Sequence, residues 1–514
     1  MNAFNEKMVE NVRAPLVRAG ALTATVEFAR REPGKVLIIV LGLHLFFWTI
    51  IPILICPNLQ LDLVEDLALG KEWQLGYWKH PPLPWWVADF AYRLTGHIDV
   101  VYVLGPLAVV ICLYAVWLLA RETFSAFGGL IAVLALEGVH FYNSSAVKFA
   151  HDQMQLPFWA FTGLFFYRAI KRGSPLNWIL AGAFLAGAFW AKYAAFALAA
   201  TLALFLIADP VARRAWRTPG PFLMAISFAV VIAPNVWWLI GHDFLPLQYV
   251  DGRARAALHW YQFIAYPLQW IGSQALDLLP AAGLLAMLYL RENRRISDSK
   301  SLDRRYVTSL ALGPFLLVTT ISALLGRLVI AMWGYPLWSF APLALLMWLK
   351  PAADTQALRR FAVAFIAVFV AFPIIYVATE IGEPLVRDRP KATQFPGRAL
   401  AEIVTRDWHN RYGTPVTYVG GSEFVANNVA VYSLDRPHVV VHGELRLSPW
   451  VDVGDLRRRG AVLVWEEGQQ GGNLDQLRAT FGDLEVQPVL ILAPQTWFPV
   501  RPRRVAYAIV PPRP

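Results

Sequence analysis

The sequence has little charge and almost no cysteine. Only 16% of the 514 residues are charged, whereas soluble globular proteins are about 25% charged. The two cysteines, Cys56 and Cys112, lie in or beside apolar stretches, so no disulfide framework is expected. No internal repeat and no low-complexity segment is visible. These absences argue against a soluble enzyme of ordinary composition and against a small domain held together by disulfides.

Apolar residues make up 57% of the chain and gather in long stretches. About twenty apolar residues in a row cross the hydrocarbon core of a bilayer, which is roughly 30 Å thick. About eleven stretches approach that length, and two of them, 127–142 and 177–191, are short. The ranges are 36–56, 98–120, 127–142, 154–170, 177–191, 193–208, 222–240, 271–290, 306–325, 328–349 and 359–379. The composition therefore predicts a polytopic α-helical membrane protein.

The basic residues indicate how this bundle is oriented. Cytoplasmic segments of membrane proteins are enriched in Lys and Arg. The basic stretch 1–35 precedes the first apolar stretch, and no cleavage site follows it, so we expect a cytoplasmic N-terminal arm rather than a signal peptide. Arg213-Arg214 and the Arg-rich segment 291–295 fall on the same side. The net charge of +10 then follows from topology, and nucleic-acid binding is not expected.

The first outer loop, 57–97, is rich in Trp and Pro. Aromatic residues gather at the membrane interface. The segments 63–73 and 83–94 each have one apolar face, which predicts two short helices that lie along that interface. Pro81-Pro82 separates them, because proline does not continue a helix.

The composition changes near residue 380. Residues 36–379 form the predicted transmembrane domain, whereas 380–514 have ordinary polarity and short apolar runs. Runs typical of strands alternate with helical segments there, which predicts a small α/β domain. The strands are expected at 415–419, 439–441, 461–465 and 486–491, and the helices at 398–410 and 474–480. An odd number of spans places this domain on the outer side of the membrane.

Three carboxylates open the first outer loop. Glu65 and Asp66 follow Asp62 by three and four residues, so on a helix they share one face with it. Such a face beside a membrane suits a general base, or a divalent metal ion such as Mg, Mn or Zn with His80 as a further ligand. The plain alternative is a solvated helix face or an N-cap.

The motif Gly-Tyr-Trp-Lys-His-Pro-Pro at 76–82 follows the carboxylates. Its Lys79 is suited to binding a phosphate, and its His80 to binding a phosphate or a metal ion. The alternative for His80 is a structural residue in a turn.

Further polar residues fall at the outer ends of predicted spans. Asp152, which follows His151, either caps its helix or takes part in a site. Lys192, next to Tyr193, lies between two apolar stretches with no acidic residue close in sequence, so it either snorkels to the interface or meets an anion. The same two alternatives hold for Arg327. All of these residues share the outer side with the carboxylates of the first loop.

In their order and spacing, these residues resemble a known family. Asp62 followed by Gly-Tyr-x-x-His-Pro-Pro resembles the first-loop signature of the membrane glycosyltransferases of the GT-C class, which includes protein O-mannosyltransferases and the bacterial lipid A aminoarabinose transferase. Asp152, Lys192 and the segment from Arg327 to Pro336 resemble later motifs, so that the resemblance covers about 36–350.

The chain departs from the family pattern in two places. Leu63 stands where the family often has Glu, and Lys79 stands where Asp is common. The second departure reverses the charge beside His80, which favours a phosphate or an acidic sugar over a metal ion at this position.

The resemblance implies an inverting glycosyltransferase that moves a hexose or pentose from a polyprenyl-phosphate donor to a lipid, glycan or protein acceptor. The reaction would take place at the periplasmic face of a bacterial inner membrane. Asp62 would be the base and Asp152 the second catalytic carboxylate. The donor phosphate would contact Lys192, Arg327, His80 and Lys79. The sugar or the acceptor would contact Glu65, Asp66, Tyr77, Trp78, His151 and Tyr193.

Two other functions remain open from the sequence. One is a different lipid-linked envelope transferase or ligase, which would need a similar outer-face site. The other is a transporter, although transporters carry polar residues near the bilayer midplane and often show repeated halves.

Overall fold

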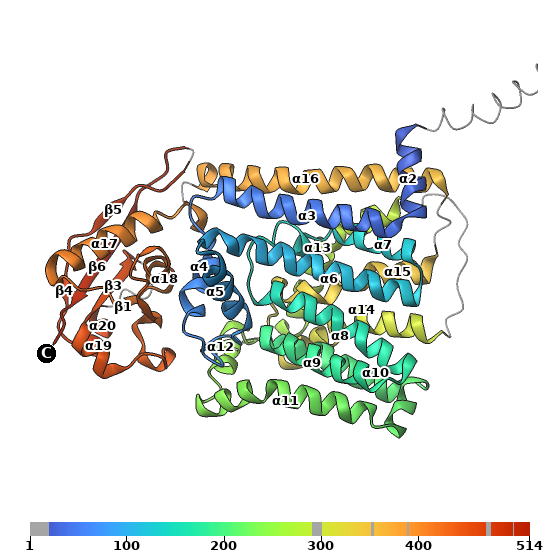
Figure 1. Ribbon diagram of the computed structural model, residues 1–514, viewed down its shortest axis with the longest axis horizontal. Coiled ribbons are helices and arrows are strands. Elements are labelled where there is room, and N and C mark those ends of the chain that lie inside the picture. Colours follow the sequence, from blue (N-terminus) through green and yellow to red (C-terminus); the bar gives the residue numbers. More distant parts are fainter. Residues whose placement is uncertain are drawn as a thin grey trace, which may run out of the picture.

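The computed structural model describes residues 20–289, 301–350, 354–387, 390–468, 474–496 and 498–513. A bundle of roughly parallel helices and a mixed α/β unit lie at opposite ends of the molecule, with α4 and α5 between them (Figure 1). The predicted cytoplasmic arm is described only from residue 20, where α2 (Ala21–Arg31) precedes the bundle. The basic segment 291–295 lies outside the described residues.

Each of the predicted spans contains one α-helix of the bundle. The helices are α3 (Pro33–Ile55), α6 (Val101–Thr123), α7 (Ala126–Leu136), α8 (His151–Arg172), α9 (Pro175–Ala191), α10 (Phe196–Ala208), α11 (Gly220–Gly241), α13 (Gln262–Ala286), α14 (Leu302–Leu325), α15 (Ala341–Leu349) and α16 (Thr355–Arg387). Within the described ranges, five are long and apolar enough to cross a membrane unaided, namely α3, α6 with the preceding turn, α11, α14 and α16. The predicted class of polytopic helical membrane protein is confirmed.

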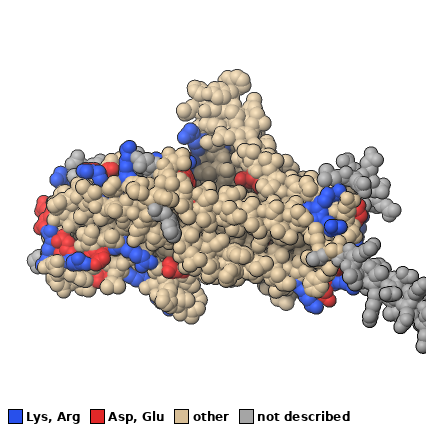
Figure 2. Space-filling view, turned by 90° about the horizontal axis from the view of Figure 1, so that it is seen from above, with Lys and Arg blue, Asp and Glu red and all other residues tan. Residues whose placement is uncertain are grey.

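The charged side chains are distributed as a membrane position requires. On the face shown in Figure 2, Lys, Arg, Asp and Glu gather toward the two ends of the molecule, and the middle is mostly uncharged. A hollow in that middle is the exception, because charged side chains lie at its rim (Figure 2). A wide uncharged belt matches the hydrocarbon core, where ionised groups are costly.

Three of the predicted spans are interrupted near their predicted outer ends. Helix α7 has 11 residues and is about 16 Å long, so it ends inside the bilayer. The chain then runs through a mostly buried irregular segment, 137–150, that contains η2 (His140–Tyr142). Asn143 stabilises this segment by donating to the carbonyls of Glu137 and Val139, at 2.9 and 3.0 Å. Irregular backbone at membrane depth is tolerated only where protein buries it.

The other two interruptions have the same form. Helix α10 follows η3 (Tyr193–Ala195), and α15 follows η5 (Ala331–Trp338). Each interruption is next to a residue that the sequence proposes for the site: Asp152 follows the irregular segment, Lys192 precedes η3, and Arg327 precedes η5.

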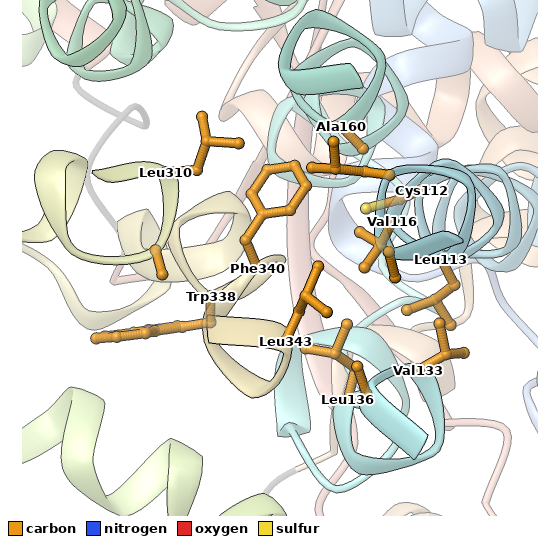
Figure 3. Close-up of a cluster of buried hydrophobic side chains, with 14 of the residues drawn as sticks. Cys112, Leu113, Val116, Val133, Leu136, Ala160, Leu310, Trp338, Phe340 and Leu343 are labelled. Atoms are coloured by element: carbon orange, nitrogen blue, oxygen red, sulfur yellow. The ribbon is translucent and has the colours of Figure 1, made fainter. Parts of the chain in front are cut away.

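The bundle core is closed by side chains from helices that are distant in sequence. In Figure 3 labelled side chains from α6, α7, α8 and α14 gather around Trp338, Phe340 and Leu343, which lie at the η5–α15 junction. Phe340 and Leu343 are fully buried. This packing fixes η5, several residues of which line the cavity described below.

Two short helices stand between the bundle and the α/β unit, as the loop composition predicts. They are α4 (Leu61–Gly70) and α5 (Leu83–Thr95). They pack closely at Gly70, where an added Cβ would lie 2.2 Å from the backbone oxygen of Trp85. A third short helix, α12 (Leu245–Arg253), follows α11 on the same side of the molecule (Figure 1).

The C-terminal part is a six-stranded mixed sheet with helices, as the strand and helix pattern predicts. Its strand order is β2-β1-β3-β6-β4, with β5 paired to β6; β1 is parallel to β2 and β3, and β6 is antiparallel to its neighbours. The elements are α17 (Gly397–Tyr412), β1 (Tyr418–Gly421), α18 (Glu423–Tyr432), β2 (His438–Val440), α19 (Val453–Arg459), β3 (Ala461–Glu466), α20 (Leu474–Phe481), β4 (Glu485–Val486), β5 (Leu490–Leu492) and β6 (Arg503–Val510). Single-turn 3-10 helices are η1 (Ile98–Val100), η6 (Ala392–Gln394), η7 (Val441–Gly443) and η8 (Leu445–Leu447), and a longer one is η4 (Ala212–Arg217).

Two details of this unit differ from the prediction. The single strand expected at 486–491 is two short strands, because the chain leaves the sheet between β4 and β5. The sequence analysis did not include α18 or β6. The division of the chain at residue 380 stays a prediction, and α16 continues beyond it to Arg387.

Candidate active site

A cavity of about 700 Å³ lies at the end of the bundle that faces the C-terminal unit (Figure 1), bounded by α4, α12 and the interrupted spans. Almost all of the residues that the sequence proposes for the site line it. They are Asp62, Glu65, Asp66, Lys79, His80, His151, Asp152, Lys192, Tyr193 and Arg327. The fold thus brings side chains from five separate parts of the chain to one cavity.

Tyr77 and Trp78 are not among the cavity-lining residues. Tyr77 is fully buried, its hydroxyl donates to the backbone oxygen of Leu69 at 2.9 Å, and its ring packs edge-on against Trp85. It therefore fixes the loop against α4 and α5, and the expected contact with a sugar is not supported. Trp78 packs against Tyr249, which does line the cavity.

Helix α4 presents the three carboxylates in different environments. Asp62 is in the first turn and partly exposed, whereas Glu65 and Asp66 are buried. Burial raises the pKa of Asp62, and the nearby positive charge of Lys79 opposes that rise. Burial and the neighbouring carboxylates Glu65 and Asp62 raise the pKa of Asp66 well above its usual range. Asp62 is thus the carboxylate best placed to exchange a proton with a bound molecule.

Lys79 is held between two carboxylates. Its ammonium lies 2.6 Å from Glu65 on α4 and 3.1 Å from Glu423, the first residue of α18 in the C-terminal unit. Burial acts to lower the pKa of Lys79, but the charges of Glu65 and Glu423 outweigh it and raise the pKa above the usual range. Lys79 stays a predicted phosphate ligand, although in this structure two protein carboxylates already match its charge.

The ion pairs of Lys79 also bear on whether this site could hold a metal ion. The set considered from the sequence was Asp62, Glu65, Asp66 and His80. Among the residues that the structure describes, no group of three or more His, Cys, Asp or Glu side chains is arranged to hold a metal ion. Lys79 occupies the place beside Glu65 that a cation would take. The residues present do not fit a metal centre.

His80 and His151 pack against each other with ring centroids 4.1 Å apart. Burial, helped by the positive charges of Lys192 and Lys79, lowers the pKa of His80 well below its usual range. His80 is therefore neutral near pH 7. It can offer a ring N–H to a phosphate oxygen, but it does not offer the positive charge that a cationic role requires.

Asp152 and Lys192 form a buried ion pair with an N–O distance of 2.6 Å. Asp152 stands in the first turn of α8, and Lys192 follows α9. The sequence offered Lys192 no nearby acid and left it either snorkelling or meeting an anion; in the structure the anion that it meets is Asp152. The reason is that α8 and α9 pack side by side, which joins residues 40 positions apart.

Arg327 is paired with Asp251 on α12 at 2.5 Å, and it also donates to the backbone oxygen of Ala254 at 3.0 Å. A β-bridge between Ala256 and Arg327 fastens the two segments. Arg253 also lines the cavity and is exposed. Of the Lys and Arg residues that line it, Arg253 alone has no ion-pair partner within the described ranges.

From the sequence alone, Asp251 has no assigned role, Arg253 contacts either a substrate headgroup or nothing, and Glu423 has no assigned role. The first two lie in an outer loop after the seventh predicted span, and the only signal was their charge. Glu423 lies in the C-terminal unit, far from every motif, so nothing in the sequence connects it with Lys79.

Comparisons with known proteins agree with this architecture. The family model for dolichyl-phosphate-mannose-protein mannosyltransferases matches residues 79–238, a range that begins in the first-loop motif and includes Asp152 and Lys192. The structure of ArnT from Cupriavidus metallidurans bound to undecaprenyl phosphate is similar with a TM-score of 0.61, at 13% identity, over 92% of this chain and 98% of that one. The chain has the GT-C fold. The predicted resemblance to this class is confirmed, and the chain is a multi-pass membrane protein of that fold.

A curated relative adds to the comparison. Lipid A galacturonosyltransferase RgtD of Rhizobium johnstonii is 28% identical over 238 residues, which are 45% of this chain and 47% of that protein. The match therefore spans about half the length of this relative. The cavity that collects the predicted site residues is the candidate active site.

Proposed function

We propose that the protein is an inverting glycosyltransferase that takes its sugar from a polyprenyl-phosphate donor and transfers it to a glycolipid, glycan or protein at the outer face of the membrane. One observation carries this proposal. A single cavity at the end of the bundle beside the C-terminal unit has carboxylates of α4 on one wall and Arg253, Arg327 and Lys192 among its other lining residues. Such a cavity separates a proton acceptor from a site for an anionic leaving group.

The reaction follows from these residues. The acceptor hydroxyl loses its proton to Asp62 as its oxygen bonds to the anomeric carbon of the donor sugar. The bond between that carbon and the phosphate oxygen breaks, and the polyprenyl phosphate leaves with the electron pair. Arg253 and Arg327 face the developing phosphate charge, and the N–H of His80 donates to it. Asp152 is paired with Lys192, so its role is to orient the reactants and not to accept the proton.

The cavity also suits the lipid part of such a donor. Its apolar lining includes Phe196, Val318 and Ile321, which come from α10 and α14. These residues continue from the charged end into the bundle. A phosphate at the charged end would therefore leave a hydrophobic chain against apolar helices, where a lipid tail is stable.

The relatives support the choice of reactants. ArnT was solved with undecaprenyl phosphate, and RgtD is named for the transfer of galacturonic acid to lipid A. We therefore propose a polyprenyl-phosphate sugar as the donor and an envelope glycolipid related to lipid A as the first acceptor to test. We propose the bacterial inner membrane as the location, with the N-terminus in the cytoplasm and the C-terminal unit in the periplasm.

The test is a comparison of envelope glycolipids by mass spectrometry. A strain that lacks the gene is expected to accumulate a glycolipid lighter by one sugar, and the wild-type gene should restore its mass. The Asp62→Asn gene should not restore it, although the protein is present in the membrane. Unchanged glycolipid and glycan masses in the deletion strain would contradict the proposal.

A further inference from the structure

We propose that Glu423 of the C-terminal unit is a positioning residue of the active site, which fixes the Lys79 ammonium between itself and Glu65 and thereby sets the electrostatic environment of Asp62. The inference rests on the proposed function and deepens it. By this proposal, the C-terminal unit contributes a residue that acts in the active site. Glu423 acts through Lys79 because Glu423 itself does not line the cavity.

The local fold explains why Glu423 reaches Lys79. Strand β1 ends at Gly421, whose φ of +109° is open only to glycine, and an added Cβ would lie 2.0 Å from the backbone oxygen of Val464. After this tight turn, α18 begins at Glu423, so Glu423 stands at the end of α18 that lies beside Lys79 of the first loop. The second carboxylate oxygen of Glu423 lies 3.6 Å from Nε2 of His442. The backbone of His442 has a φ of +53°, and its ring packs against Trp78.

The three charged groups form a compact, mostly buried cluster. The side chains of Lys79, Glu65 and Glu423 are 12%, 8% and 23% exposed. The carboxyl groups of Glu65 and Glu423 lie within 2.6 and 3.1 Å of the ammonium, so their charge offsets part of the field of Lys79 at Asp62. If Glu65 were the only partner, Lys79 would stabilise the ionised form of Asp62 more strongly.

This balance matters because Asp62 is the proposed base. A base removes a proton most effectively when its pKa lies near the working pH, and an isolated aspartate is a weak base. Burial is the main cause of the raised pKa of Asp62, and the negative charges of Asp152 and Glu423 add to it. The other charged or titratable groups that face Asp62 are Glu65 and Asp66 on α4, Lys148 in the irregular segment, Asp152 on α8 and Tyr335 on η5.

Glu423 is not needed to dock the C-terminal unit. Separate contacts join it to the first outer loop: His438 lies 2.9 Å from Glu72, and Asn58 donates to Asn428 at 3.1 Å. The hydroxyl of Tyr432 accepts from the backbone N–H of Leu59 at 2.8 Å. The contact between His438 and Glu72 is thus a matched control, because it joins the same two units without touching Lys79.

The experiment compares Glu423→Gln with His438→Gln in the purified full-length protein. With a polyprenyl-phosphate sugar and the accepted glycolipid, Glu423→Gln should move the acid limb of the kcat/KM profile to lower pH by on the order of half a unit. It should also lower kcat a few-fold, because a weaker base removes the proton less readily. Glu423→Asp should partly restore the position of the acid limb and the value of kcat. His438→Gln should leave the pH profile unchanged.

A second measurement does not depend on turnover. Infrared difference titration follows the carboxyl band that disappears in Asp62→Asn, and this band should titrate at lower pH in Glu423→Gln than in the wild type. An unshifted band and profile, or an equal shift in His438→Gln, would overturn the role of Glu423. Absence of transfer by the wild-type protein would instead contradict the proposed function, and the infrared titration would still decide the positioning role.

Discussion

Of the carboxylates that line the cavity, Asp62 and Asp66 have no ion-pair partner among the described residues, and Asp62 is the more exposed of the two. Glu65 is bound to Lys79, Asp152 to Lys192 and Asp251 to Arg327. A paired carboxylate is a poor proton acceptor, because protonation would cost it the ion pair. The assignment of Asp62 as base therefore rests on this contrast as well as on its place before the first-loop motif.

Replacing Asp62 by Asn should lower the rate of transfer by about 10²–10⁴-fold, because this is what one general base typically contributes. The amide has nearly the same shape, so expression and donor binding should persist. Turnover by purified protein and a donor titration measure the two effects separately. If the variant kept near-normal turnover, the base would have to be another residue, and Asp152→Asn would be tested next.

The pH dependence of the reaction should reflect the same residue. Burial raises the pKa of Asp62 above the ordinary aspartate value of 3.8. Below the raised pKa the carboxyl is protonated and accepts no proton, so kcat/KM should fall as the pH falls through a value above 3.8. The profile is measured with donor and acceptor held below saturation. An acid limb at or below 3.8 would show that Asp62 is not the group that titrates.

The Asp152–Lys192 pair calls for a different kind of test. Lys192→Met leaves the carboxylate of Asp152 buried without a counter-ion, and breaking one side of a buried pair costs about 3–5 kcal/mol. We expect a lower unfolding temperature and weaker donor binding. In the double variant Asp152→Asn, Lys192→Met the unfolding temperature should largely recover, while transfer should stay lost. Recovery of both properties would restrict the pair to a structural role.

At the scale of single elements, the short helices are what the sequence predicted best. The apolar faces of the first outer loop indicated helices at 63–73 and 83–94, and the structure has α4 and α5 there. Spacing of three and four residues also placed the carboxylates on one face. What the sequence did not show is the close approach at Gly70, because a glycine in a helix gives no sign of which backbone lies against it.

Gly70→Ala should therefore disturb the site without touching a polar group. The added Cβ meets the backbone of Trp85, which does not yield like a flexible side chain, and overpacking of this kind costs about 1–3 kcal/mol. We expect a lower unfolding temperature and reduced turnover, since α4 carries Asp62. Gly42→Ala on α3 is the matched control, because no atom lies within 4 Å of its added Cβ. Equal effects of the two variants would show that α4 and α5 are free to separate.

At the scale of the whole molecule, hydropathy located the spans but not the places where they are interrupted. The stretch 127–142 had the composition of a short span, yet α7 ends at Leu136 and irregular backbone follows. Buried irregular backbone has the same apolar side chains as a helix, so composition does not distinguish them. Pairings such as Lys192 with Asp152, or Lys79 with Glu423, depend on which helices pack together, and one sequence read alone contains no record of this.

All of these residue assignments assume one orientation of the chain in the membrane. If the N-terminus is cytoplasmic, the helices of the bundle bring the cavity and the C-terminal unit to the outer side, and the basic residues stay inside. A reporter fused after Pro514 should then be active only in the form that works in the periplasm, and a reporter in the loop between α10 and α11 only in the form that works in the cytoplasm. Cytoplasmic activity after Pro514 would place Asp62 on the cytoplasmic face, and the donor would have to be used there.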